Sequence, residues 1–436
     1  MGGKVSGSPL EGRTVFFPTM AEAGSRAIAA AFRSVGIEAR PMPPSDEETL
    51  VLGGRYSSGE ECLPLKVTLG DALKLLEHST IPPDKMAIFM PTSDGPCRFG
   101  QYGSFMKVVF RDLGYGDVLL VSPTCADGYS GVGEHADLLI RTAWRALVGS
   151  DLLQKLLLRV RPYEKDKGAA DRAYEEATRL LCSAIEVPGE PPRRKLERIA
   201  GSLREGRALL RAVPADFSMP RPLVGVVGEI FCRLNTFSND DVMRKVEDAG
   251  GECWISDVSE WVWSTNADHM RTLKRFGKRL TMEMLGAKLK WHFQTKDEHA
   301  LMEAFRGDFK GYEEPHDIRE IYELARPYLP PEGALGEMML SVGKTVYMYR
   351  KGVDGILDIN PFSCMNGIVS EAVYPRVSRD CDGLPVRVLY FDGTRADRRY
   401  ELEIFMDLVR AYSARKKRPR RLPEGMGITV PRADAG

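Results

Sequence analysis

The chain has 436 residues, of which 43% are hydrophobic and 28% charged, as in soluble globular proteins of two or three domains. Lys and Arg balance Asp and Glu at 61 each, so net charge gives no case for a nucleic-acid partner. The sequence has neither the run of about 20 apolar residues that a membrane helix needs nor a signal peptide. We therefore expect a cytoplasmic protein without a membrane or nucleic-acid partner.

The first 134 residues alternate between two kinds of hydrophobic pattern. Helical spacing occurs at 21–36, 63–77 and 100–113. Between these helices lie short apolar runs typical of buried strands, at 13–19, 37–43, 85–91 and 117–123. Strands that alternate with helices predict a parallel sheet with helices on both faces. Residues 1–134 are therefore predicted to form an N-terminal α/β lobe.

A second α/β lobe is predicted over residues 221–412, after a charged helical segment or linker at 135–220. Its predicted strands are 221–231, 252–258, 355–361 and 384–393, with helices at 239–251, 363–377 and 400–414 and a mostly helical insertion at 268–350. A basic cluster opens the last segment, 413–436, which we expect to be a flexible, solvated tail. The predicted fold class is α/β, with two doubly wound lobes and a helical insertion.

Nucleotide-binding motifs fail on their spacing. The segment SVGKTV at 341–346 contains Gly-Lys-Thr, but a P-loop also needs a glycine five residues before Gly343, where this chain has Met338. No G-x-G-x-x-G is present either. ATP or NAD binding is therefore not supported by the sequence.

Three of the eight cysteines share one local setting. Cys62, Cys97 and Cys364 each stand at the start of a predicted helix, and the last two directly follow a predicted strand. Loops at the carboxyl ends of parallel strands form the ligand crevice of α/β folds, and helix N-termini favour a thiolate and a negatively charged iron–sulfur cluster. The alternative for each cysteine alone is a small buried side chain. The shared setting favours a cluster site between the lobes.

The other cysteines fit this pattern less well. Cys125 also follows a predicted strand and is a candidate fourth ligand. Cys182 lies within a helical pattern and is expected in the core, while structural or incidental roles are expected for Cys232, Cys253 and Cys381. No pair has C-x-x-C spacing, which argues against a zinc ribbon or a bacterial ferredoxin motif.

Five segments together resemble a known group of proteins. They are GEECLPLKVTLG, PTSDGPCRFGQYG, VGEIFCRLNTFSND, INPFSCMNGIVSE and LPVRVLYFDGTR, spread over residues 59–394. In these segments the chain is similar to the activase-associated relatives of the 2-hydroxyacyl-CoA dehydratases and double-cubane cluster proteins. The resemblance implies Rossmann-like lobes that hold a [4Fe-4S] cluster through Cys62, Cys97 and Cys364.

The same resemblance implies a chemistry and a partner. Three thiolates leave one iron of a cubane without a protein ligand, where a substrate meets a low-potential electron. The chain lacks the activase domain fused to larger relatives, so an ATP-dependent activase would be a separate electron donor. Cys232 departs from the family pattern, which puts the number of ligands in doubt. Single or double cubane, substrate and oligomer (homodimer or heterodimer) stay open.

Polar residues beside the cysteines are the remaining candidates. Arg98, Gln101 and Lys66 are expected to hydrogen-bond cluster sulfides or an anionic substrate such as an acyl-CoA, or else to be ordinary helix-surface residues. Glu229, Arg233 and Asn235 are expected to face the crevice or to cap a helix. The leading hypothesis is an oxygen-sensitive reductase, a dehydratase-like lyase or an electron-transfer component. The alternative is a scaffold or assembly protein that carries a cluster without turnover.

Overall fold

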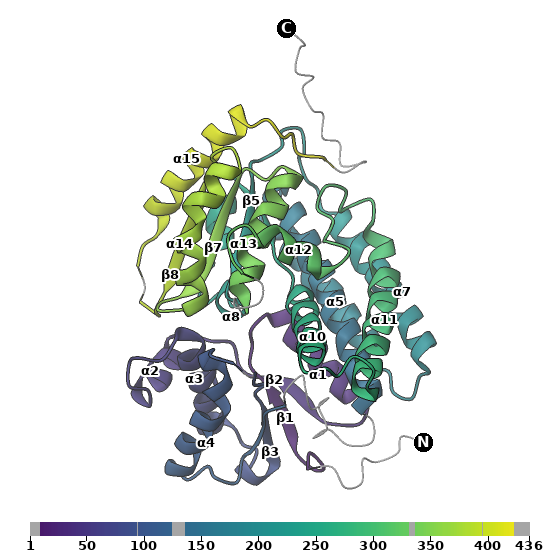
Figure 1. Cartoon of the computed structure of the whole chain (residues 1–436). Helices are drawn as coiled ribbons and strands as arrows, with labels where there is room; N and C mark the ends of the chain where they lie inside the picture. The colour runs from purple at the N-terminus through teal and green to yellow at the C-terminus, as the bar shows by residue number, and fades with distance from the viewer. Residues whose placement is uncertain (1–8, 94, 124–135, 331–335, 395, 423–436) are drawn as a thin grey trace.

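The computed structural model describes residues 9–93, 95–123, 136–330, 336–394 and 396–422. Within them the chain forms two separate four-stranded sheets, each wholly parallel (Figure 1). The N-terminal strands are β1 (Thr14–Phe17), β2 (Ala39–Pro41), β3 (Met86–Phe89) and β4 (Leu119–Val121). The C-terminal strands are β5 (Leu223–Gly228), β6 (Glu252–Ile255), β7 (Gly355–Pro361) and β8 (Val386–Phe391). The prediction of two parallel α/β sheets is confirmed.

Both sheets have the same strand order. The N-terminal sheet runs β2-β1-β3-β4 and the C-terminal sheet runs β6-β5-β7-β8. In each sheet, the second strand lies on one side of the first strand. The chain then crosses over, so that the third strand lies on the other side of the first. The ligand crevice of such a sheet lies at this reversal, between its first and third strands. The loops after β1, β3, β5 and β7 are therefore the expected places for a ligand site.

Four helices accompany the first sheet: α1 (Glu22–Arg33), α2 (Glu47–Arg55), α3 (Leu63–His78) and α4 (Tyr102–Asp112). The sequence did not predict α2, because Gly53 and Gly54 interrupt its pattern. Asp46 nonetheless starts it with a capping box to Thr49. A Cβ atom at Gly53 would lie 2.0 Å from the carbonyl oxygen of Lys66 in α3. That glycine therefore permits close packing of α2 against α3.

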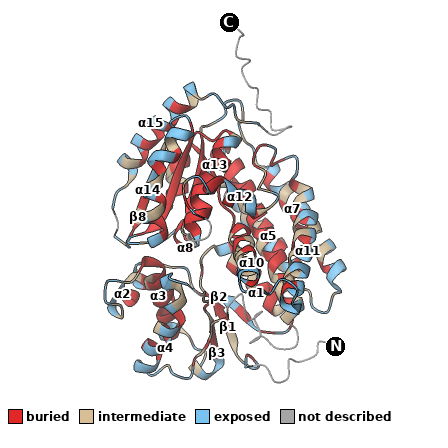
Figure 2. Ribbon diagram, in the orientation of Figure 1, coloured by how far each residue is buried: buried red, intermediate tan, exposed pale blue. Residues whose placement is uncertain are grey.

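The segment between the lobes packs into both of them. Its helices are α5 (Ala136–Val160), α6 (Ala169–Glu186) and α7 (Pro192–Arg211). The long helix α5 is largely buried and contacts α1 on one side and β6 on the other (Figure 2). One hydrophobic cluster accordingly runs from Val15 of β1 through Leu153 to Trp254 of β6. The helical segment is thus a shared wall of the two lobes.

The C-terminal half contributes short α8 (Ile230–Leu234), α9 (Val242–Asp248), the inserted helices α10 (Val258–Arg275), α11 (Met282–Met302) and α12 (Ile318–Ala325), and then α13 (Glu337–Lys351), α14 (Met365–Asp380) and α15 (Arg399–Arg415). The Gly-Lys-Thr segment lies inside α13. There Lys344 is completely buried and paired with Glu260 and Glu314. A lysine with two buried carboxylate partners has a structural role, in agreement with the failed P-loop motif.

The described part of the predicted basic tail, residues 413–422, is mostly exposed beyond α15 but is anchored at two side chains. Residues 413–415 complete α15. Arg420 is nearly buried and lies 2.6 Å from Glu252, while Lys416 lies 2.7 Å from Asp354. Buried carboxylates at the ends of β6 and β7 thus recruit the basic side chains, because an unpaired buried charge is costly. Residues 423–436 lie outside the described residues.

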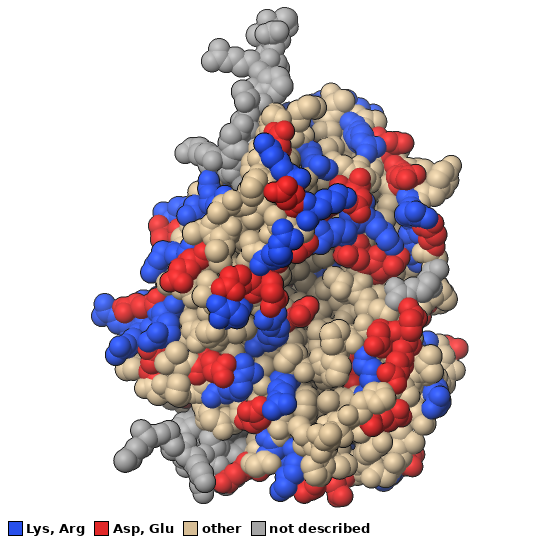
Figure 3. All heavy atoms as spheres, turned by 180° about the vertical axis from the view of Figure 1, so that it is seen from behind, with Lys and Arg blue, Asp and Glu red and all other residues tan. Residues whose placement is uncertain are grey.

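The surface is electrostatically mixed, as the neutral composition predicts. Seen from behind, blue basic and red acidic side chains alternate over most of the face (Figure 3). None of the described helices is both long enough and apolar enough to span a bilayer.

Candidate functional site

Cys97 and Cys364 occupy the same topological position in the two lobes. Each follows the third strand of its sheet and is the N-cap residue of the next helix: Cys97 of the one-turn helix η2 (Arg98–Gln101) before α4, and Cys364 of α14. The preceding turns use Gly95 at φ 115° and Ser363 at φ 62°. Positive φ is easy for glycine but strained for serine, and such strain is typical of functional sites.

Cys62 reaches the same place from the N-cap of α3. Pro64 stands in the first turn of α3, where its missing N–H costs nothing. The three cysteines thus share the N-cap position that the sequence predicted. Backbone N–H groups at these helix starts, of Leu65, Phe99 and Gly367, face the respective thiols and lower their pKa values.

The three helix starts converge between the lobes. Nη1 of Arg98, the residue after Cys97, donates hydrogen bonds to the Glu60 carbonyl at 2.9 Å and to Ser363 Oγ at 3.3 Å. Glu60 lies two residues before Cys62 and Ser363 lies directly before Cys364, so the bonds link the surroundings of all three cysteines. The buried carboxylate of Glu229 raises the pKa of each of the three thiols, so all lie within its electrostatic reach. The structure thus brings the starts of α3, η2 and α14, which carry Cys62, Cys97 and Cys364 at their N-caps, close together.

Burial outweighs the helix N-termini in the thiols' protonation. Desolvation is the largest cause and raises the pKa of Cys62 and Cys97, and that of Cys364 to about 12. Cys62 is buried, Cys364 is half-buried and Cys97 is exposed on the crevice wall. At all three thiols, burial therefore raises the pKa by more than the backbone N–H groups lower it. A positively charged metal centre is the kind of partner that displaces such protons.

An open pocket of about 270 Å³ adjoins Cys62. Its lining residues come from the loop before α3 and from the η2–α4 turn: Glu60, Glu61, Cys62, Leu65, Arg98, Gln101 and Phe105. Two of the predicted polar candidates, Arg98 and Gln101, therefore line it. The third, Lys66, instead points its Nζ toward the Gly59 carbonyl at 3.4 Å and is not among the lining residues.

Tyr102 is a site residue that sequence reasoning missed. Its hydroxyl lies 2.7 Å from Cys62 Sγ, and its side chain is buried between η2 and α3. The sequence predicted a helix over residues 100–113 but indicated no role for Tyr102. Tyr102 lies only five residues after Cys97, and this short separation could have marked it as a candidate site residue.

Two buried carboxyls close the C-terminal side of the crevice. Glu229 caps α8 by accepting from the N–H groups of Phe231 and Cys232, at 3.0 and 2.7 Å. Glu337, at the start of α13, accepts from Ile230 N–H at 2.8 Å. Burial and the charge of Glu229 raise the pKa of Glu337 to about 8. From the sequence, Glu229 was expected to face the crevice or to cap a helix, but Glu337 was missed, because no sequence motif includes that residue.

The N-terminus of α8 therefore differs from the N-termini of α3, η2 and α14. Its N–H groups are satisfied by carboxylates, whereas α3, η2 and α14 carry thiols at the N-cap. Arg233 and Asn235 are buried and bond to the backbone: Arg233 to Gly228, and Asn235 to Thr19 across the lobes at 2.8 Å. Asn235 therefore links the two lobes, whereas Arg233 bonds only within the C-terminal lobe.

The other described cysteines are placed as structural residues. Cys232 is fully buried in the apolar cluster around α8, and burial raises its pKa far above the usual thiol range. Cys182 lies in α6 near Arg26 and Arg33, on the far side of α1. Cys253 is buried in β6, and Cys381 ends α14. Cys125 lies outside the described residues.

No group of three or more His, Cys, Asp or Glu among the described residues is arranged to hold one metal ion. Ligands of one zinc sit about 2.3 Å from it and so crowd together, whereas each thiolate of a cubane binds a different iron. Near Cys364, the buried Oδ1 atom of Asn366 accepts no hydrogen bond from the described residues. It can therefore accept one from another group.

Comparisons with family models and with curated proteins found no match to this chain. The function must therefore be inferred from the positions of the three cysteines and from the similarity of the five segments to relatives of the 2-hydroxyacyl-CoA dehydratases.

Proposed function

We propose that the chain binds a [4Fe-4S] cluster through Cys62, Cys97 and Cys364 and uses it in low-potential electron chemistry. The observation that carries this proposal is the convergence of three cysteine-capped helix starts from two lobes in one crevice. When bound, such a cluster supplies an iron without a protein ligand and a site for one electron. Reductase or 2-hydroxyacyl-CoA dehydratase-like chemistry follows from the family resemblance.

The chain's own groups have distinct parts in this proposal. The N–H groups at the starts of α3, η2 and α14 stabilise negative charge at the sulfur atoms. Tyr102 holds Cys62 Sγ by a hydrogen bond, which fixes its direction and tunes its basicity. Arg98 ties the crevice walls together and presents a guanidinium to the pocket.

The pocket provides a place for a small substrate group. Leu65 and Phe105 supply apolar surface, while Arg98 and Gln101 supply donors. A carboxylate or thioester oxygen is the type of group these donors bind. An ATP-dependent activase is proposed as the separate electron donor, as the family resemblance implies.

Anaerobic purification followed by iron and acid-labile sulfide analysis tests the proposal. We expect about four irons and four sulfides per chain and a broad visible absorbance. A colourless chain with no iron after reconstitution would refute it. Cyanide binding to the reduced cluster, followed by EPR, then separates an enzyme from a scaffold: a shifted signal indicates an open iron, and an unchanged signal favours the scaffold.

A further inference from the structure

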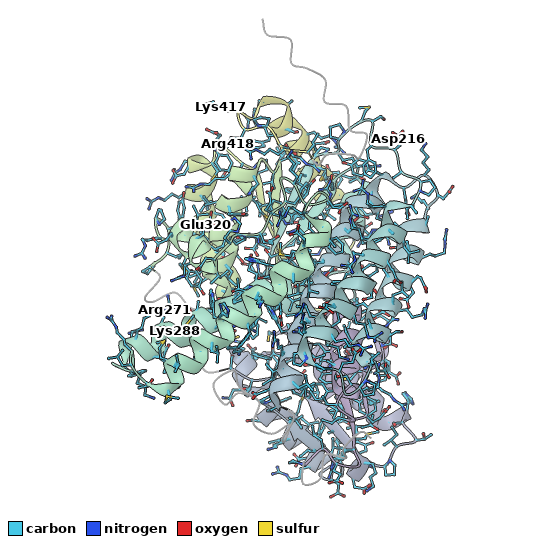
Figure 4. All side chains as sticks on the ribbon, turned by 90° about the vertical axis from the view of Figure 1, so that its right-hand side faces the viewer. Asp216, Arg271, Lys288, Glu320, Lys417 and Arg418 are labelled. Atoms are coloured by element: carbon cyan, nitrogen blue, oxygen red, sulfur yellow. The ribbon has the colours of Figure 1, made fainter. Side chains whose placement is uncertain are left out.

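The end of the α10–α11 hairpin stands out from the body of the protein. We define it as residues 271–293, the last turn of α10, the connecting turn and the first half of α11. Arg271 and Lys288 mark it at the margin of the molecule in Figure 4. Leu273 and Met284 are buried and hold the two helices together.

The hairpin end exposes an unusual amount of apolar surface. Leu280 and Met282 are 102% and 81% exposed, and Phe276 is 76% exposed. Leu285 and Leu289 of α11 are more than half exposed, at 57% and 54%. Soluble monomers expose large apolar residues singly, whereas a group of them marks an interaction site.

The apolar residues of α11 form a helical stripe. Met282, Leu285, Leu289 and Phe293 are spaced by three, four and four residues, which puts them on one side of the helix. The stripe spans about 16 Å along the helix axis at 1.5 Å per residue. This spacing is the one by which helices recognise a second helix.

The charge of the hairpin end is strongly one-sided. Residues 271–290 contain seven Lys and Arg but one acidic residue, Glu283, in a chain whose total charge is zero. Glu283 is already paired with Lys278 at 3.2 Å. A basic rim around an apolar stripe is complementary to an acidic amphipathic partner.

We infer that the hairpin end docks an acidic amphipathic helix of a partner protein. A second copy of this chain fits poorly, because it would set the same basic rim against itself. A lipid surface also fits less well. Phe293 lies back against the body, where the Arg141 guanidinium stacks 4.9 Å from its ring centre, so a flat surface at the tip would leave the inner stripe uncovered. The inference is independent of the cluster proposal.

The test measures binding of a labelled synthetic helix of about three heptads with a Leu stripe and Glu at the other surface positions, by fluorescence anisotropy. The control peptide replaces each Glu with Lys. We expect the acidic peptide to bind at least about tenfold more tightly than the basic one, and added salt to weaken it. Equal binding of the two peptides would overturn the inference.

Two variants locate the binding surface. Leu285→Asp with Leu289→Asp should weaken acidic-peptide binding at least about tenfold, and Lys278→Glu with Arg279→Glu should weaken it and flatten its salt dependence. Leu209→Asp on α7, which is also exposed, should leave binding unchanged. All substitutions are on the surface, and thermal unfolding checks that the fold is kept.

Three further outcomes would contradict the inference. The first is an unchanged affinity in the Leu285→Asp, Leu289→Asp variant. The second is hairpin-dependent binding to phosphatidylglycerol vesicles without binding to the acidic peptide, which would indicate a membrane. The third is a dimer in sedimentation velocity that this variant abolishes, which would indicate a second copy.

Discussion

The two lobes have the same topology but very different sheets. β1 to β4 are three or four residues long, whereas β5, β7 and β8 have six or seven. Every residue of β5 and β7 is buried, but the outer N-terminal strands are only partly covered. Cys97 and Cys364 nevertheless occupy equivalent positions at the reversal of strand order. The equivalent position of the two cysteines thus follows from the shared topology and does not depend on strand length.

The lobes differ at the second helix start. The first helices after the second strands, α2 and α10, both start at an aspartate, Asp46 and Asp257. The second helices, α3 and α11, start at Cys62 and Thr281. The C-terminal lobe thus has a threonine where the N-terminal lobe has its second N-cap cysteine.

The largest expected effect comes from removing either equivalent cysteine. Cys97→Ala and Cys364→Ala should each abolish cluster retention, because each removes one of three thiolates. Cys182→Ala should retain the iron, since Cys182 lies in α6 away from the crevice. Iron and sulfide content per chain after anaerobic reconstitution is the measurement. Equal iron in the Cys97→Ala and Cys182→Ala variants would refute the ligand assignment.

The second prediction compares one buried lysine from each lobe. Lys344→Met should lower the free energy of unfolding by about 3–5 kcal/mol, because it removes the cation paired with buried Glu260 and leaves Glu314 with Lys155 alone. Lys74→Met should cost only about 1–2 kcal/mol, since its partner Asp46 is half exposed. Urea unfolding measures both. Equal losses would mean that the C-terminal network does not depend on its lysine.

The third prediction concerns a carboxyl that the C-terminal sheet buries. Asp358 of β7 bonds to Asn360 and Tyr374, and burial raises its pKa from 3.8 to about 6. The folded state thus holds this proton more tightly than the unfolded state. Its stabilisation is fully present below about pH 4 and is lost as the pH rises through about 6.

Asp358→Asn removes that titration and keeps the size of the side chain. The difference in unfolding free energy, wild type minus variant, should fall by about 2.4 kcal/mol between pH 4 and pH 7, out of a full effect of about 3 kcal/mol at about 1.4 kcal/mol per pKa unit. Urea unfolding at several pH values measures it. A difference that is constant with pH would contradict the raised pKa. β3, the equivalent strand, has only apolar residues and no counterpart to this effect.

Much of the fold could be predicted from the sequence because it depends on local periodicity. Both sheets follow from apolar runs, and the range predicted for β7 coincides with the strand. Helix α2 was missed because its glycines serve packing against α3, which is a tertiary property. The anchoring of the basic tail could not be predicted for a related reason: Glu252 and Asp354, which pair with Arg420 and Lys416, lie far away in sequence.

The candidate site was predictable where a residue type marks a helix start. Cys62, Cys97 and Cys364 were found in this way. Glu337 could not be found, because its role depends on α13 lying beside α8. The raised thiol pKa values were also out of reach, since they depend on the depth of burial. A signal was overlooked, however: a glycine stands three residues after Cys97 and after Cys364.

The smallest predicted effect tests this repeated Cys-x-x-Gly. A Cβ at Gly100 would lie 2.6 Å from the Ser93 carbonyl oxygen, and one at Gly367 would lie 2.5 Å from Asn360 Cγ. In both lobes glycine therefore lets the helix start lie directly against the end of its third strand. Gly100→Ala and Gly367→Ala should each lower the free energy of unfolding by about 1–3 kcal/mol.

Gly286→Ala is the matched control, since no atom lies within 4 Å of its added Cβ on α11, and it should stabilise the helix by about 0.5–1 kcal/mol. The loss at Gly100 should exceed that at Gly367, because a backbone carbonyl gives way less readily than the Asn360 side chain. Urea unfolding gives the ranking. If both substitutions behave like Gly286→Ala, the close approach of helix and strand does not constrain the two cysteines. A loss in only one lobe would mean that the equivalence is one of topology alone.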